Sequence, residues 1–234
     1  MRHIILLALV IALFAPGPLH AEGYRLLSLE GRVLKWGAPE FGSGSTVTYG
    51  FVQGEQSFDD AINCRQLVAM DKLLSRWSID LAEFEAAVGE AFAIWSRAAD
   101  LQFRRARGEE QADIMLGGQA VPRGIAFANV SYDIESAADG LASLEQALIC
   151  LNPLAPWQLD ERADGPKGFS LPIVLAHEIG HAIGLDHPGP SGQLMGYSYQ
   201  EEITGLMPGD IAGAQRLYGP PSPHPVPKPA SPSR

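Results

Sequence analysis

Residues 176–196 read AHEIGHAIGLDHPGPSGQLMG and hold three of the six histidines in the chain. On a helix, His177 and His181 lie four positions apart, so their imidazoles project from one face and can bind a single metal ion. Glu178 is rotated about 100° from that pair, which makes it a poor ligand but places it within reach of a water beside the ion. This spacing predicts a metal site with an acid–base group next to it.

A third ligand depends on how the chain leaves this helix. Gly184 comes three residues after His181, and glycine can adopt the left-handed conformation that ends a helix. The chain can then reverse and return His187 to the same ion. Three neutral nitrogen ligands with a fourth position open are typical of catalytic zinc rather than structural zinc. The alternative is a solvated helix face. Against this alternative, the other three histidines lie near the chain ends, at positions 3, 20 and 224. Every histidine in the middle of the chain therefore belongs to the cluster, which a solvated helix face would not explain.

The elements that must position these residues follow from the apolar pattern. Strands are expected where β-branched and apolar residues cluster between turn residues, at 46–52, 101–105, 113–116, 124–130 and 146–151. An amphipathic helix is expected from the caps at Ser78 and Asp80 to Trp95, a second helix from near Ser170, and a third at 208–218. Residues 53–79 are expected to be a polar loop with a short amphipathic segment holding Cys64, and 131–145 an acidic loop. This order predicts an α/β or α+β domain.

The two ends of the chain differ from the middle. Residues 1–21 combine Arg2, an apolar run, a Pro/Gly break and a small residue at Ala21, which is the layout of a secretory signal peptide. The apolar run is too short to span a membrane comfortably, and an uncleaved anchor is the alternative. Residues 220–234 are Pro-rich and predict a disordered tail. We therefore expect a signal peptide at 1–21, a folded domain at 22–219, and secretion or export to the periplasm without stable membrane insertion.

Composition narrows the range of partners. The net charge is −10 and no long basic run is present, which argues against nucleic acid as a partner. Cys64 and Cys150 are the only cysteines. In an exported protein this even count favours a disulfide, and two buried free thiols are the alternative. We expect a monomer.

The metal motif and its flanks resemble a known family. HEIGHAIGLDH, followed by Met195 eight residues after His187, is similar to the metzincin metallopeptidases, whose methionine lies in a turn beneath the metal. Within them the chain looks most like the matrixins, the family of matrix metalloproteinase catalytic domains. The supporting matches are Trp36 followed by VTY (47–49), AF-x-x-W (91–95), L-x-F (101–103), ADI (112–114) and L-x-x-x-DI-x-G-x-Q-x-LYG (206–219). The resemblance covers about residues 36–219.

This resemblance implies a secreted endopeptidase with one catalytic zinc ion. His177, His181 and His187 would be the zinc ligands, and Glu178 the general base that activates a zinc-bound water. The implied metzincin fold is a five-stranded, twisted, mixed sheet with an antiparallel edge strand, two long helices and a small C-terminal subdomain with one helix. The peptide substrate would bind as an extended strand along residues 124–130.

Several positions depart from the matrixin pattern. The loop at 117–124, GGQAVPRG, lacks the histidine and aspartate that many matrixins use for a second zinc, so one zinc is expected. The same loop lacks a carboxylate cluster, so calcium is not supported there. An acidic, solvated loop is the preferred interpretation of Asp133, Glu135 and Asp139, with calcium binding as the alternative. Gly209 replaces the first of two acids, which leaves Asp210 to bond the methionine turn or simply to begin a helix.

Two residues close to the ligands keep open roles. Tyr197 lies two places after Met195, as in the astacin and serralysin branches, where this tyrosine can bind zinc or stabilise an oxyanion. Its alternatives here are a pocket wall or plain packing. Asp186 is either a carboxylate that orients a ligand or a solvated turn residue.

Two rival functions follow from the same residues. One is a peptidase of the serralysin or astacin branch, although the tail lacks the glycine-aspartate repeats of serralysins. The other is a catalytically silent, secreted zinc-binding or interaction module. The presence of Glu178 argues against the second, because a silent site does not need that acid.

Overall fold

The computed structural model describes residues 23–107, 111–159, 168–189 and 192–222. The expected signal peptide and almost all of the expected Pro-rich tail lie outside these residues. Within the described part of the chain, no helix is both long and apolar enough to cross a membrane.

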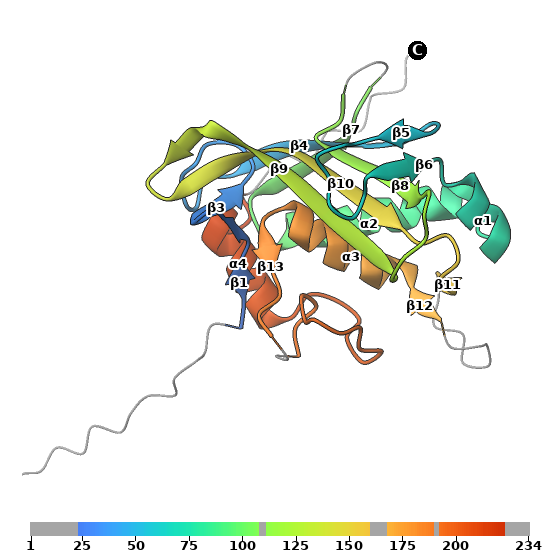
Figure 1. Cartoon of the computed structure of the whole chain (residues 1–234). Coiled ribbons are helices and arrows are strands. Elements are labelled where there is room, and N and C mark those ends of the chain that lie inside the picture. The colour runs from blue at the N-terminus through green and yellow to red at the C-terminus, as the bar shows by residue number, and fades with distance from the viewer. Residues whose placement is uncertain (1–22, 108–110, 160–167, 190–191, 223–234) are drawn as a thin grey trace, which may run out of the picture.

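A twisted mixed sheet forms the centre of the fold, with the strand order β2-β3-β10-β8-β4-β7 (Figure 1). β8 pairs in parallel with β4 and β10, β4 is parallel to β7, and β3 is parallel to the start of β10. The antiparallel strand β9 runs along the edge of β10. The α/β class with an antiparallel edge strand is therefore confirmed, but in the described part of the chain this sheet has nine strands rather than the expected five, because short strands extend it. These strands span Ser28–Leu29 (β2), Arg32–Lys35 (β3), Ser45–Phe51 (β4), Leu101–Arg105 (β7), Ile114–Gln119 (β8), Ala126–Ala138 (β9) and Leu141–Leu151 (β10).

The acidic loop expected at 131–145 is wrong, because most of it belongs to a long hairpin of β9 and β10. Asp139 and Gly140 connect the two strands, and their φ angles are 48° and 79°. Positive φ at both central residues is characteristic of a two-residue hairpin turn, and Asp-Gly is a preferred sequence for it. Asp133 and Glu135 therefore lie on the edge strand rather than in a loop.

Residues 23–80 contain short elements that the apolar pattern did not predict. β5 and β6 form a hairpin, and β6 pairs with the end of β8. Cys64 lies just before β6, not in the amphipathic segment, which is the separate helix α1. Cys64 forms a disulfide with Cys150 of β10, with 5.7 Å between the Cα atoms. These elements span Arg25–Leu26 (β1), Gln56–Ser57 (β5), Gln66–Val68 (β6) and Asp71–Trp77 (α1).

Three longer helices lie close to their expected positions: α2 (Leu81–Ala98), α3 (Leu171–Ala182) and α4 (Pro208–Tyr218). Asp80 caps α2 as expected, and Glu83 completes a reciprocal capping box with it. α2 packs against α3 beneath the sheet (Figure 1). The buried Trp95 of α2 donates its indole N–H to the carbonyl of Ala176, at 3.0 Å. Three short strands complete the fold: Trp157–Gln158 (β11), Phe169–Ser170 (β12) and Leu185–Asp186 (β13).

The N-terminal part of the fold contains a fully buried lysine. The ammonium group of Lys35 donates to the carbonyls of Trp36 and Ala38 at 2.8 and 2.7 Å, and to the hydroxyl of Ser43 at 3.1 Å. Burial lowers the pKa of Lys35 to about 8, partly offset by Glu40. The three hydrogen bonds explain how the charge is accommodated away from water.

Replacing both Cys64 and Cys150 by Ser should lower the free energy of unfolding by about 3 kcal/mol, because the bond restricts a long loop in the unfolded chain. Urea denaturation measures this change. Reducing agent should lower the stability of the wild type by a similar amount and leave the double variant unchanged. Equal stability of the oxidised wild type and the double variant would contradict the prediction.

Stability should also depend on the charge of Lys35. Between pH 8 and about 10.5 the unfolded chain retains the Lys35 proton while the folded chain releases it, so stability rises with pH. Relative to Lys35→Met, the wild type should gain about 3 kcal/mol across this range. Urea denaturation at a series of pH values tests this, and parallel curves for the two proteins would exclude it.

Candidate active site

α3 supplies two of the expected ligands from a helix that is buried on most of its surface. Its apolar residues pack into the core, while His177 and His181 face the opposite wall of a cleft. Gly180 lies between them, and a Cβ there would be 2.2 Å from the sulfur of Met195. The glycine therefore allows the buried Met195 side chain to lie directly against the helix, as expected for the methionine turn.

The chain reversal after α3 requires a glycine for two reasons. Gly184 has a φ of +99°, which side chains disfavour, and a Cβ there would lie 2.2 Å from the carbonyl oxygen of Leu34. The Gly184 N–H bonds to the carbonyl of His181 at 3.0 Å, and β13 begins at the next residue. The predicted turn therefore exists and returns His187 to the helix.

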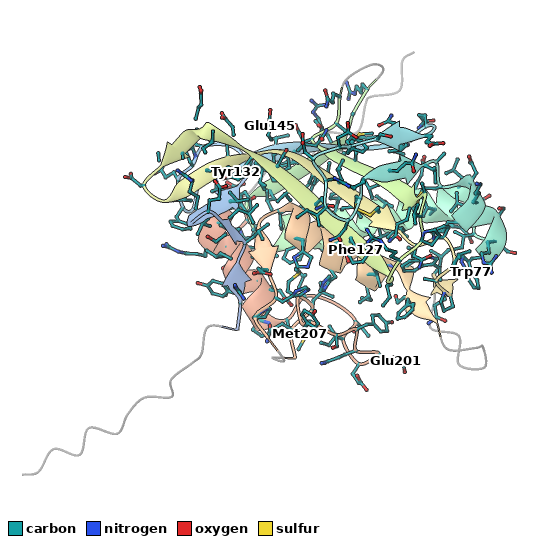
Figure 2. All side chains as sticks on the ribbon, in the orientation of Figure 1. Trp77, Phe127, Tyr132, Glu145, Glu201 and Met207 are labelled. Atoms are coloured by element: carbon teal, nitrogen blue, oxygen red, sulfur yellow. A yellow bond between two sulfur atoms is a disulfide. The ribbon has the colours of Figure 1, made fainter. Side chains whose placement is uncertain are left out.

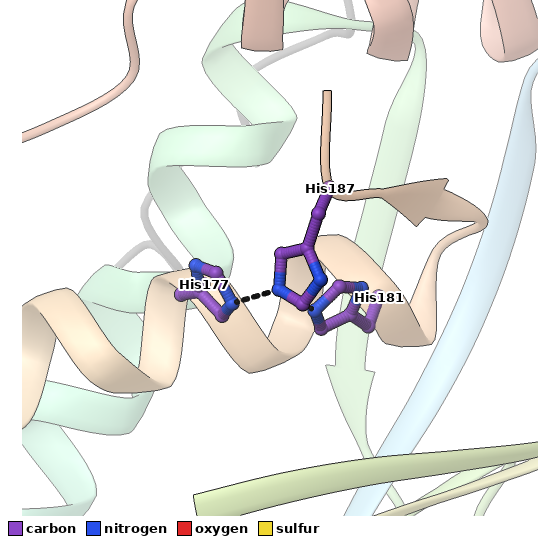
Figure 3. Close-up of side chains that lie close together, drawn as sticks. All are labelled: His177, His181 and His187. Atoms are coloured by element: carbon purple, nitrogen blue, oxygen red, sulfur yellow. Dashed lines mark hydrogen bonds between the residues drawn. The ribbon is translucent and has the colours of Figure 1, made fainter. Parts of the chain in front are cut away.

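The three histidines converge on one point (Figure 3). The Nε2 atom of His187 lies 3.2 Å from that of His177 and 3.1 Å from that of His181. Among the described residues, this is the one group of three or more His, Cys, Asp or Glu side chains close enough to share a metal ion.

The hydrogen bonds of the rings indicate what this point can bind. Nδ1 of His177 lies 2.8 Å from the carbonyl oxygen of Leu194, and Nδ1 of His181 lies 2.9 Å from that of Leu185. A carbonyl only accepts, so each Nδ1 carries the proton and each Nε2 presents a lone pair. These two lone pairs cannot form a hydrogen bond with each other, and Nε2 of His187 lies within hydrogen-bonding distance of both. A cation between the Nε2 atoms satisfies them, and the donor set fits zinc.

Burial keeps these rings neutral. Desolvation lowers the pKa of His177 and of His187, and it lowers the pKa of His181 to about 3. A neutral imidazole is the form that binds metal, so the site requires no deprotonation at neutral pH.

Glu178 is buried, with 6% of its surface exposed, and it lines the same cleft as the three histidines. Desolvation raises the pKa of its carboxyl group to about 8, which makes it a stronger base than an ordinary glutamate. A cation held by the neighbouring imidazoles would favour the ionised form of this carboxyl.

The cleft has a volume of about 540 Å³ and two different walls. Residues 125–130, from the start of β9 and the residue before it, form one wall, and residues of the 193–203 segment form the other. Figure 2 shows Phe127 on the β9 side and Glu201 on the loop below. Leu27, Leu29 and Ile62 also line the cleft. The sequence reasoning missed these three, because they lie outside any periodic apolar pattern.

Asp210 lies behind the methionine turn rather than in the cleft. Its buried carboxylate accepts hydrogen bonds from the backbone N–H groups of Leu194, Met195 and Met207, at 2.8, 3.0 and 2.8 Å. The pKa of Asp210 is raised, because burial, which raises it, outweighs the three backbone hydrogen bonds, which lower it. Asp210 therefore fixes the segment whose Leu194 carbonyl orients His177.

The structure also places Tyr197 and Gly209. Tyr197 is 79% exposed, and its ring lies edge-on to that of His187, with 5.0 Å between the ring centres. Gly209 packs against the N-terminal segment: a Cβ there would lie 2.0 Å from the carbonyl oxygen of Gly23. Position 209, where many matrixins have an acid, is thus a glycine at a point where the backbone of α4 packs closely against the backbone of the N-terminal segment.

Replacing Asp210 by Ala leaves three backbone N–H groups without their acceptor, and should lower the free energy of unfolding by about 3 kcal/mol. Urea denaturation measures the loss. Asp71→Ala is the matched control, because Asp71 is an exposed acid in the first turn of α1 and should change stability by only about 0.5 kcal/mol. Similar effects of the two substitutions would refute the role of Asp210.

Comparison with known proteins identifies relatives of this site. Interstitial collagenase A from Mus musculus is 36% identical over 148 residues, which are 62% of this chain and 30% of that protein. Macrophage metalloelastase from Oryctolagus cuniculus is 34% identical over 159 residues, with coverages of 64% and 32%. Neutrophil collagenase from Homo sapiens is 32% identical over 166 residues, with coverages of 65% and 33%. The alignments thus span about a third of the length of these relatives. The sequence profile of one family, Matrixin, matches residues 70–219, and the chain therefore belongs to the matrixin family.

Proposed function

We propose that this domain is a secreted, zinc-dependent endopeptidase. The observation that carries the proposal is the convergence of three neutral histidine Nε2 atoms beside a buried glutamate on the floor of one cleft. Membership of the matrixin family, which uses catalytic zinc, supports it. The names of the relatives, collagenase and metalloelastase, suggest extracellular matrix proteins as a substrate class to test.

In this proposal His177, His181 and His187 hold the zinc ion, and Met195 supports the helix beneath them. Zinc supplies Lewis acidity: it polarises the scissile carbonyl and lowers the pKa of a coordinated water to about 7. The carbonyls of Leu194 and Leu185 keep two of the rings in the tautomer that presents Nε2 to the metal.

Glu178 would act as the general base and then as the general acid. Its carboxylate takes a proton from the attacking water and delivers it to the amide nitrogen as the C–N bond breaks. Burial raises the pKa of Glu178, which strengthens it as a proton acceptor, and a zinc ion on the neighbouring imidazoles would keep the carboxyl ionised near neutral pH. Tyr197, whose ring borders His187, is a further candidate for contact with the bound substrate or the metal.

The substrate would bind as an extended strand next to β9. β9 pairs with β10 on one side, and residues 125–130 line the cleft on the other. An extended peptide can therefore add to this sheet edge through main-chain hydrogen bonds, with side chains contacting the 193–203 wall. The proposed organisation is a signal peptide at 1–21, this domain at 22–219 and a Pro-rich tail at 220–234, in a monomeric, exported protein.

Glu178→Gln should retain zinc and lose peptide cleavage by at least a hundredfold (roughly 10²–10⁴ for a general base), because the amide keeps the shape of the side chain but cannot accept the proton. The assay is cleavage of casein or a fluorogenic peptide, with zinc content measured on the same sample. Glu90→Gln, at an exposed acid on α2, is the control and should cleave at the wild-type rate.

The metal itself gives an independent test. A chelator should abolish wild-type cleavage and added zinc should restore it, whereas His181→Ala should lose both zinc and cleavage. Cleavage by Glu178→Gln at a near wild-type rate would refute the mechanism. Zinc binding by the wild type without any cleavage would instead favour the silent zinc-binding module.

A further inference from the structure

We propose that the N-terminal strand β1 positions two of the three metal ligands, and that Arg25 acts through Asp186 on the third ligand, His187. This inference rests on the proposed zinc site and goes beyond it, because β1 precedes the residues 70–219 matched by the family profile. Arg25 and Asp186 are positioning residues here, since neither contacts the reacting atoms.

β1 pairs with β13. Arg25 is opposite Asp186 and Leu26 is opposite Leu185 in a short antiparallel ladder. The next residue continues the contact, because the Leu27 N–H donates to the carbonyl of Gly184 at 2.8 Å. Residues 25–27 therefore bind the connection between the end of α3 and His187 along its length.

This connection carries groups that hold the rings and backbone of the ligands. The carbonyl of Leu185 orients the ring of His181, at 2.9 Å from Nδ1. The carboxylate of Asp186 accepts the backbone N–H of His187 at 2.8 Å, and the same oxygen lies 4.0 Å from Nδ1 of that ring. A displacement of β13 would thus move both ligands together.

Arg25 holds the carboxylate from the other side. Its Nε lies 3.0 Å from the second oxygen of Asp186, whose side chain is only 26% exposed. One carboxylate therefore links β1 to the third ligand, with one oxygen on Arg25 and the other on the His187 backbone. Groups that hold metal ligands in this way commonly change metal affinity by tenfold or more when removed, roughly 10–100-fold.

The N-terminal segment reaches this position because α4 leaves room for it. A Cβ on Gly209 would lie 2.0 Å from the carbonyl of Gly23, and a Cβ on Gly213 would lie 3.0 Å from Cβ of Tyr24. These two glycines are one turn apart on α4, so the backbone of residues 23–24 can pass close to the helix. The segment is thus packed against the domain immediately before it pairs with β13.

The test measures zinc affinity without substrate, by competition with a chromophoric chelator, in the full-length exported protein. Asp186→Ala should weaken zinc binding about tenfold, because it removes both contacts of the carboxylate. Arg25→Ala should weaken it about threefold, since the arginine side chain is 68% exposed and such pairs are weak. The double variant should bind zinc no more weakly than Asp186→Ala, because Arg25 acts through Asp186.

The matched control is Arg97→Ala, which removes an arginine of similar exposure from its ion pair with Glu90 on α2 and should leave zinc affinity unchanged. Thermal melting of the zinc-free proteins separates positioning from folding. We expect zinc-free Arg25→Ala to have the same melting temperature as the zinc-free wild type. A clear fall in that melting temperature would instead assign Arg25 a merely structural role and overturn it.

Two further outcomes are distinguishable. If the wild type binds one zinc and Arg25→Ala binds it equally tightly, the positioning role is wrong and the proposed function stands. If the wild type binds no zinc, the proposed metal site is wrong, and this inference is overturned together with it.

Discussion

Three imidazole Nε2 atoms directed at one point are the constraint on which the rest of this structure depends. Without a cation such an arrangement is unfavourable, because the ring of His187 has at most one Nε2 proton to share between the desolvated lone pairs of His177 and His181. The fold must therefore hold each ring in place independently of the metal. For His177 and His181 it does so with carbonyl groups from two segments, those of Leu194 and Leu185, which fix the protonated nitrogens and direct the others inward.

These two segments are themselves held by residues distant in sequence. The end of α3 is fixed by Trp36, whose indole donates to the carbonyl of Ala182 at 2.8 Å, and by Tyr218, whose hydroxyl donates to that of Ile183 at 2.7 Å. The tyrosine oxygen also accepts the backbone N–H of Trp36 at 3.0 Å, so the two supports are linked. The segment carrying Leu194 depends on Asp210 at the start of α4. The site thus lies where the N-terminal segment, α3 and α4 meet.

The sequence predicted those parts of the site that are local. The spacing of His177, Glu178 and His181 defines a helix face, and the glycine at 184 marks the reversal. Both follow from backbone geometry over a few residues. The caps and apolar spacing of α2 are equally local. The supports are different: β1 and β13 have two residues each, too few for any periodicity, and their pairing depends on the tertiary fold. The β9–β10 hairpin had a readable signal in Asp139-Gly140, but the acidic residues around it favoured a loop.

The disulfide has a consequence for how cleavage of this chain would be detected. It joins the loop beside β9 to the central strand β10, and Asn129 of β9 accepts the backbone N–H groups of Asn63 and Cys64 at 2.9 and 2.8 Å. Any single cut between Cys64 and Cys150 leaves the two pieces covalently joined. A nicked molecule would run at full size on a denaturing gel until it is reduced, so apparent intactness without reductant says little about how many peptide bonds in this region have survived.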